Sequence, residues 1–148
     1  MSILNLQGSY FSIDNPLRVV DRWINRYRYR QALQINRRPL ELRWTERAER
    51  ELDRRAQVLI VELQLYFSCV VKKRVLFHQR AGFATTRVDD RLAIAFHPVA
   101  SAVCDPNEFA LNHPAGRDLT SGPAARMVPP IVEIDYRAGR WEGQFRYR

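Results

Sequence analysis

The chain has 148 residues and a mass of 17.4 kDa, which is the size of one ordinary domain and too short for two independent cores. Hydrophobic residues make up 46% and charged residues 27%, a composition that indicates a folded soluble domain and excludes an intrinsically disordered chain. The formal net charge of +8 permits nucleic acid, anionic lipid or an acidic protein as partner.

The sequence also limits the compartment and the cofactor chemistry. Two cysteines, Cys69 and Cys104, are too few for the disulfide framework of a small secreted scaffold. Residues 1–17 carry no cation and make no secretory signal. Uninterrupted apolar runs such as Val58–Val61 are far below the roughly 20 residues of a membrane-spanning helix. We therefore expect a cytoplasmic protein with reduced thiols and no membrane span.

The first predicted element is an amphipathic helix that begins at Pro16, after an irregular tail over residues 1–14. Asn15 is a good N-cap, and proline is tolerated at the first helical position because its missing N–H has no partner there. Helical spacing places Leu17, Val20, Ile24 and Tyr27 on one face, and Arg18, Arg22, Arg26 and Arg30 on the other. The apolar face is expected to pack on a sheet.

A strand and a short second helix follow. Leu40, Leu42 and Trp44 alternate with Glu41 and Arg43, which is typical of a half-buried strand. Thr45 can then cap a helix that carries Ala48 and Leu52 on one side. On its solvent side, Glu46 with Arg50 and Glu51 with Arg55 are spaced four apart.

Residues 56–80 contain no Gly, Pro, Asn or Asp, and apolar residues fall on odd positions from Leu59 to Phe67. This favours two strands with a break between Phe67 and Lys73, because one strand rarely exceeds ten residues. The alternative is that the preceding helix continues through Ala56, Leu59, Leu63 and Tyr66. The β-branched and aromatic content favours the sheet.

Further strands are predicted at 83–88 and 92–103, the second with an edge or bulge at Pro98. Five of the eight prolines lie in residues 105–130, which predicts a long loop. Residues 132–147 alternate as a hairpin, and only an even-numbered turn such as Ala138-Gly139 places Tyr136 on the same face as Trp141. The predicted fold is one α+β domain over residues 1–148, with both helices packed on a mostly antiparallel sheet that ends in this hairpin.

Possible metal ligands or nucleophiles are few. Cys69, His78, His97, Cys104 and His113 are suitable zinc ligands, but no pair has the short spacing of structural zinc sites. His97 with Cys104 and Asp105 is the one cluster that suggests nucleophilic catalysis, and no family signature surrounds it. The six glycines form no phosphate-binding fingerprint. We therefore expect no metal site, no cofactor and no catalytic residues.

One fragment resembles a known family. Leu42-Arg43-Trp44-Thr45, followed by Ala48 and Leu52, is similar to the strand-to-helix start of the RelE/ParE-like toxins, small basic α+β proteins that act on ribosomal or gyrase targets. In that family the segment opens the chain and leads into a second helix, whereas here forty residues precede it and a strand-like stretch follows. No catalytic residue of the family maps onto this sequence, so we take no function from it.

The most informative functional feature is the density of cations early in the chain. Residues 1–74 carry 15 basic and 8 acidic residues, and arginines on one helix face can release counterions from phosphates while a tyrosine stacks on a base. The predicted interface for nucleic acid or an acidic protein contains Arg18, Arg22, Arg26, Tyr29, Arg30, Arg37 and Arg38. The alternative is a solvated helix face whose charge keeps the domain soluble, or whose arginines pair with Glu46, Glu49 and Glu51 on the second helix.

The sequence therefore favours a non-catalytic binding protein that uses a basic helix face. Two other hypotheses belong to different classes. The first is a metal-dependent or thiol-based enzyme that uses Cys104 with His97 or His113. The second is a homo-oligomer that assembles through the hairpin aromatics Trp141, Phe145 and Tyr147.

Overall fold

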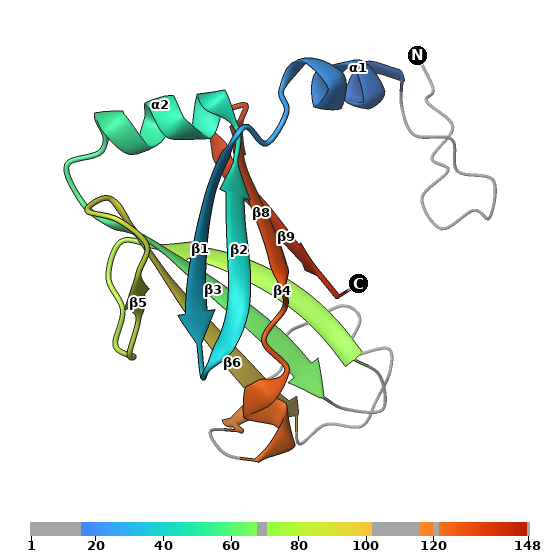
Figure 1. The fold of residues 1–148 in the computed structure, drawn as a ribbon, viewed down its shortest axis with the longest axis vertical. Helices are drawn as coiled ribbons and strands as arrows, with labels where there is room; N and C mark the ends of the chain where they lie inside the picture. The colour runs from blue at the N-terminus through green and yellow to red at the C-terminus, as the bar shows by residue number, and fades with distance from the viewer. Residues whose placement is uncertain (1–15, 68–70, 102–115, 120–121, 148) are drawn as a thin grey trace.

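The computed structural model describes residues 16–67, 71–101, 116–119 and 122–147. Within them, two β-sheets pack around a shared hydrophobic core, with two helices nearby (Figure 1). The elements are α1 (Pro16–Ile24), β1 (Tyr29–Ile35), β2 (Arg38–Trp44), α2 (Glu46–Arg54), β3 (Leu59–Phe67), β4 (Val71–His78), β5 (Thr86–Arg87), β6 (Leu92–Ser101), β7 (Gly116–Asp118), the 3-10 helix η1 (Pro123–Arg126), β8 (Ile131–Arg137) and β9 (Arg140–Arg146).

The α+β class is as predicted, but there are two sheets instead of one. Sheet A has the order β1-β2-β8-β9, and sheet B has the order β4-β3-β6-β5 with β7 added to β6. Each sheet contains one parallel pair, β2 with β8 and β3 with β6, among antiparallel ones. The strands of sheet A run obliquely to those of sheet B (Figure 1). A single sheet was a wrong prediction because residue alternation identifies a strand's buried face and not its neighbours.

The core lies between the inner faces of the two sheets. Sheet A contributes residues such as Leu40, Leu42 and Ile134, and sheet B contributes residues such as Leu63 and Ile94, all at most 2% exposed. Burying each such side chain contributes about 1.5 to 3 kcal/mol relative to leaving it in water. This burial explains why the odd-numbered positions from Leu59 to Phe67 form strand β3, as predicted, and not a continuation of the helix.

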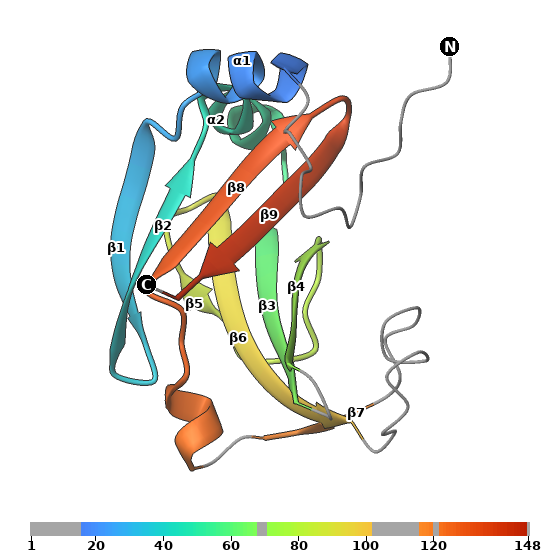
Figure 2. The ribbon, with the colours of Figure 1, turned by 90° about the vertical axis from the view of Figure 1, so that its right-hand side faces the viewer.

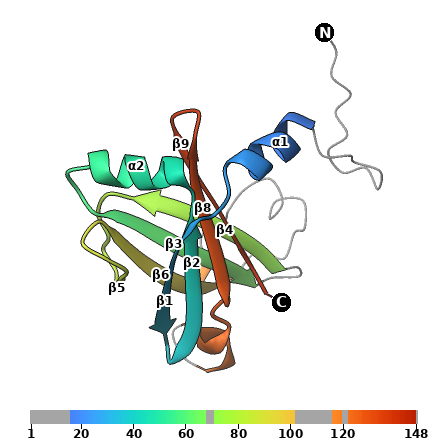
Figure 3. The same cartoon turned by 45° about the horizontal axis from the view of Figure 1, so that its top comes forward.

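Helix α2 lies across one end of the two sheets (Figures 1 and 3). Thr45 is its N-cap, as predicted, and its hydroxyl accepts a hydrogen bond from the Ala48 amide at 3.3 Å. Ala48 and Leu52 are fully buried on the inner side of the helix. The cap and these two residues therefore fix both the start of α2 and its rotation about its axis.

Helix α1 is shorter than predicted, and its apolar side is not packed on a sheet. It ends at Ile24 instead of continuing past Tyr27, and strand β1 begins at Tyr29. Leu17 is 77% exposed and Trp23 is 70% exposed. The helix instead contacts the rest of the protein through a polar residue, Asp21. A helical pattern identifies an amphipathic segment, but it does not decide which face meets the core.

The strands from 83 onward follow the prediction in part. Residues 83–88 contain only the two-residue strand β5, whereas β6 is a full strand over Leu92–Ser101. Pro98 accepts a hydrogen bond from the Leu119 amide at 2.8 Å, on the side where β7 ends. Its missing N–H therefore costs no ladder bond with β3. The predicted loop at 105–130 contains β7 and η1, and residues 105–115 lie outside the described residues.

The C-terminal hairpin forms as predicted. Strands β8 and β9 pair in the expected register, with Tyr136 opposite Trp141 and a turn at Ala138-Gly139. Both turn residues have positive φ, 52° and 76°, which is the type I′ geometry that matches strand twist. The hairpin is not a free surface, because Phe145 is 3% exposed and Trp141 stacks on Phe77 of β4. Two of the three aromatic residues expected to bind a second copy, Trp141 and Phe145, therefore pack within this chain, whereas Tyr147 is 38% exposed.

Glycine at position 143 permits the two sheets to meet. A Cβ at Gly143 would lie 2.7 Å from Val75 Cγ1 and 3.0 Å from Phe77 Cζ. Both distances are shorter than the usual 3.5 to 4.0 Å between carbon atoms. Strand β4 therefore packs directly over β9, and Figure 2 shows the two strands on the same side of the molecule.

Candidate functional site

Five exposed arginines lie before, along and after β1, the terminal strand of sheet A. We call them the basic edge: Arg26, Arg28, Arg30, Arg37 and Arg38. Arg30 lies in β1, whereas Arg37 occupies the turn to β2 and Arg38 begins β2. At about 3.3 Å per residue, Arg30 is roughly 17 Å along the strand from Ile35, which pairs with Arg38. The structure therefore places most of the predicted interface along a strand and not on one helix face.

Three predicted interface residues lie outside the basic edge. Arg18 is exposed on α1, and the side chain of Arg22 is not among the described ones. Tyr29 is not free to stack on a base, because its ring stacks on Trp44 at 6.1 Å and its hydroxyl donates to Glu46 at 2.9 Å. The ring and the hydroxyl of Tyr29 are both engaged within the protein, which makes Tyr29 a structural residue of sheet A.

The arginines of the basic edge are not neutralised by carboxylates of the second helix. Glu46, Glu49 and Glu51 are paired with other arginines, namely Arg50 at 3.7 Å, Arg91 at 2.9 Å and Arg54 at 3.5 Å. Within the described residues, no side-chain hydrogen bond or ion pair engages any arginine of the basic edge. The structure therefore contradicts the alternative in which the second helix neutralises these charges.

Two cations of this surface are absent from the sequence prediction. Arg28 falls near the apolar face when the segment is placed in a helix, but in a strand it shares the parity of Arg30. Arg126 in η1 is exposed, and η1 meets the β1–β2 turn where Asn36 donates to the Ala125 carbonyl at 2.8 Å. Strand spacing could have identified Arg28, whereas Arg126 is brought in by tertiary contact alone.

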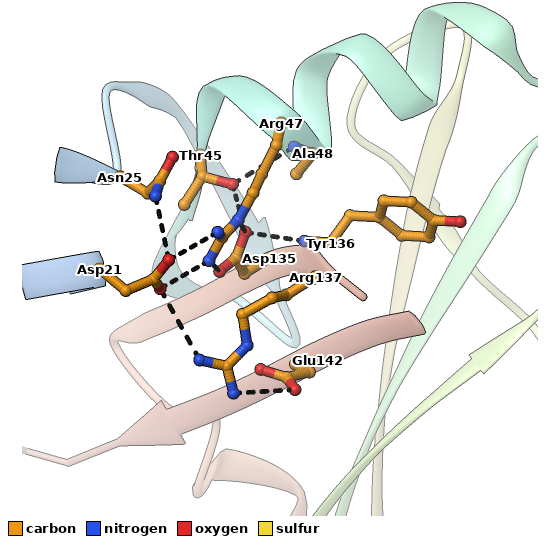
Figure 4. Close-up of polar contacts among 9 residues, drawn as sticks. All are labelled: Asp21, Asn25, Thr45, Arg47, Ala48, Asp135, Tyr136, Arg137 and Glu142. Carbon is orange, nitrogen blue, oxygen red and sulfur yellow. Dashed lines mark hydrogen bonds and ion pairs between the residues drawn. The ribbon is translucent and has the colours of Figure 1, made fainter. Parts of the chain in front are cut away.

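A polar network holds α1 against α2 and β8 (Figure 4). Arg47 of α2 donates to both carboxylate oxygens of Asp21, each at 2.9 Å, and also pairs with Asp135 of β8. Arg137 approaches Asp21 at 3.7 Å. Bidentate guanidinium pairing of this kind fixes orientation as well as attraction. Arg47 therefore links three elements that are far apart in the sequence.

The carboxylates of this network are held in their charged form. The hydrogen bond from Arg47 lowers the pKa of Asp21. Burial would raise the pKa of Asp135, but hydrogen bonds from Arg47 and from Thr45, the latter at 2.5 Å, lower it. A polar hollow of about 250 Å³ lies beside the network, lined by both acidic and basic side chains. Because all four carboxylates that line it are paired with Arg47, Arg137 or Arg146, we assign this region a structural role.

A second polar cluster lies on the outer face of sheet B. Glu62 of β3 is 6% exposed, and its two carboxylate oxygens lie 3.0 Å from His78 Nε2 and 2.9 Å from His97 Nδ1. The two histidines belong to the strands that flank β3. Phe83 covers them, with its ring edge-on to His97 at 4.5 Å and to His78 at 6.0 Å. The two predicted candidates His78 and His97 therefore meet on a buried carboxylate.

The hydrogen bonds in this cluster shift both partners toward their charged forms. Burial would raise the pKa of Glu62, but hydrogen bonds from His97, His78 and Gln64 lower it to about 2. The hydrogen bond to Glu62 raises the pKa of His97. Because the pKa of Glu62 is lowered, its contribution to stability is lost as the pH falls from 4.5 toward 2. Because the pKa of His97 is raised, its contribution is lost as the pH rises from 6.5 through the folded pKa. The cluster therefore stabilises the fold most between these limits.

The sequence-derived metal and thiol candidates gain no support. Cys69, Cys104 and His113 lie outside the described residues. Across the parts of the chain that are described, no group of three or more His, Cys, Asp or Glu residues could hold a metal ion. In the same parts, no helix is long and apolar enough to cross a membrane.

Comparisons with known proteins identify no relative. No protein-family model, no curated protein and no solved structure matches the chain. The resemblance of residues 42–52 to the RelE/ParE-like toxins is therefore not accompanied by a family match.

Proposed function

We propose that the protein is a non-catalytic binding module that contacts an acidic partner, a protein surface or a nucleic acid, through the basic edge. The observation that supports this proposal most directly is the set of exposed arginines with no carboxylate partner among the described residues. Elsewhere in these residues, carboxylates such as Asp21, Glu49 and Glu133 are used in ion pairs. A surface with unsatisfied positive charge attracts anionic partners over a distance of about 10 Å at ordinary salt.

The interface differs from the predicted helix face in shape. The arginines of the basic edge follow a strand and its turn, so they form an extended row instead of a helical stripe. The β1–β2 hairpin positions this row, because Leu33 and Ile35 on the opposite side of the strand pack against the core. A rigid scaffold of this kind presents its charges without the entropy cost of ordering a free segment on binding.

The test compares two triple variants that carry the same net charge. Replacing Arg28, Arg30 and Arg38 by Gln changes the basic edge, whereas replacing Arg80, Arg87 and Arg140 by Gln changes exposed arginines elsewhere. Both lower the formal charge from +8 by three. Binding of labelled poly-glutamate and of a single-stranded oligonucleotide is measured by fluorescence anisotropy at several salt concentrations.

We expect the first triple to weaken binding by about tenfold or more and the second to have a small effect, because nearby charges act more strongly than distant screened ones. Equal losses in the two triples would show that only net charge matters. Unchanged binding in both would remove the proposal.

A further inference from the structure

The two edges of sheet A differ in how close another strand of the chain comes to them. In a hairpin with a two-residue turn, the two residues that flank the turn form a hydrogen-bonded pair, and hydrogen-bonded pairs then alternate with non-hydrogen-bonded pairs along the strands. Residues of the non-hydrogen-bonded pairs direct their N–H and C=O groups away from the partner strand. In β9 this leaves the backbone groups of Trp141, Gly143 and Phe145 directed away from β8. Strand β4 occupies part of that edge, because Lys73 donates to the Phe145 carbonyl at 3.1 Å, and Val75 lies over the adjoining face of the sheet at Gly143.

The β1 edge is open by the same reasoning. The turn Asn36-Arg37 has φ values of 50° and 64°, and Ile35 and Arg38 flank it. Arg30, Ala32 and Gln34 therefore direct their N–H and C=O groups away from β2, and all three residues are exposed. Within the described residues, no backbone hydrogen bond outside the hairpin reaches them. One contact is made at this edge, a hydrogen bond of 3.4 Å from the Gln31 side chain to the Ala32 carbonyl.

An open strand edge with unpaired backbone groups is a template for another strand. Here the template carries charge of one sign. Arg28 and Arg30 fall on the same alternate positions as Ala32 and Gln34, and Arg37 and Arg38 lie at the far end of the strand. An added strand places residues opposite Arg30 on the same face of the sheet, where opposite charges stabilise a cross-strand pair and like charges destabilise it. The edge therefore favours an extended segment that places carboxylates opposite Arg28 and Arg30.

We propose that the β1 edge binds an extended acidic peptide as an additional strand of sheet A, which makes the partner a protein segment. This inference rests on the proposed function and specifies its partner. Pairing of β1 with β1 of a second copy is disfavoured, because it brings two basic edges together. A nucleic acid uses the arginines alone and makes no demand on the N–H groups of Arg30, Ala32 and Gln34.

The first experiment alters only the ligand, so the fold of the protein is not perturbed. The probe is a labelled peptide of about ten residues, enough to span β1, in which glutamate alternates with threonine or valine. Two versions carry N-methyl groups, one on the glutamate nitrogens and the other on the nitrogens between them. The parent peptide and the two methylated versions carry the same charge. Each methylated version blocks the amides on one edge of the extended peptide, and only one of the two edges can face β1.

We expect one methylated version to bind about tenfold or more weakly than the parent and the other to bind nearly as well, because only one set of amides pairs with β1. Loss with methylated glutamates indicates an antiparallel added strand, and loss with the other set indicates a parallel one. Equal affinity of all three peptides would overturn strand addition.

The second experiment alters the protein at Ala32. Ala32→Pro removes an N–H that faces away from β2, so it spares the β1–β2 ladder, and Ala32→Thr keeps that N–H as the matched control. We expect the proline variant to lose peptide binding by about tenfold and the threonine variant to retain it. Amide exchange of Arg30, Ala32 and Gln34 in the unaltered protein should slow when the peptide is added.

The outcomes separate the two proposals. If the Arg28, Arg30 and Arg38 triple loses binding while Ala32→Pro and peptide methylation have no effect, the basic edge binds anions but strand addition is wrong. If the same triple loses oligonucleotide binding and the peptide does not bind the unaltered protein, the partner is a nucleic acid and strand addition is wrong. If the triple has no effect on any probe, the proposed function is wrong as well.

Discussion

Replacing Gly143 by alanine tests the close approach of the two sheets. The new Cβ would lie 2.7 Å from Val75 Cγ1 and 3.0 Å from Phe77 Cζ, so β4 and β9 must separate by about 1 Å to restore ordinary carbon contacts. Overpacking of this kind costs about 1 to 3 kcal/mol. Restricting the unfolded chain by replacing glycine gains about 0.4 to 1 kcal/mol. The expected net effect on the free energy of unfolding is a loss of up to about 2.6 kcal/mol.

The assay is urea unfolding, with Gly82→Ala as the matched control. A Cβ at Gly82 would meet no atom within 4 Å, so only the gain from the unfolded state applies and stability should rise slightly. Adding Val75→Ala removes the closest atom at Gly143, so the double variant should be more stable than the sum of the two single effects predicts. If Gly143→Ala is as stable as Gly82→Ala, the sheets do not approach each other as described.

Three further changes have expected outcomes. His97→Asn keeps a hydrogen-bond donor to Glu62 but cannot be protonated, so its loss of stability relative to the unaltered protein should be larger at pH 5.5 than at pH 8 in urea unfolding; a constant difference would contradict the raised pKa of His97. Ala138→Asn should raise the free energy of unfolding by about 0.5 to 1 kcal/mol, measured by thermal melting, because asparagine tolerates the positive φ of this turn better than alanine. Arg47→Met should destabilise by about 1 to 3 kcal/mol because it removes the bidentate partner of Asp21 and the ion-pair partner of Asp135, whereas Arg50→Met at an exposed helix pair should cost under about 0.5 kcal/mol; equal costs in urea unfolding would show that the network does not anchor α1.

The parts of the fold that follow from local pattern were predictable. The Thr45 cap, the strand from Leu59 and the Ala138-Gly139 turn each depend on a few neighbouring residues. These signals are alternation, a side-chain cap and turn parity, which act over short distances. Pairing between distant segments depends on which buried faces fit together, and no local signal specifies it. The parallel β2–β8 pair and the division into two sheets were therefore not predicted.

The candidate site shows the same limit. The cation density was visible in the sequence, but the four-residue spacing of its arginines predicted a helix through Arg30, where the structure has a strand that begins at Tyr29. Tyr29 stacking on Trp44 in sheet A decides between them in the folded chain. Glu62 was not identified, because a lone carboxylate in an apolar strand gives no sign that histidines from two other strands will reach it.

The parallel β2–β8 pair has a consequence for how the chain matures. Leu42 pairs with Val132, 90 positions later in synthesis. At about 5 to 20 residues per second, roughly 5 to 18 seconds separate the emergence of these partners from the ribosome. During that interval the edge of β2 that pairs with β8 is unpaired, and the leucine side chains of β2 stay exposed to water. Nascent chains therefore need protection by a chaperone or by transient collapse until translation supplies β8.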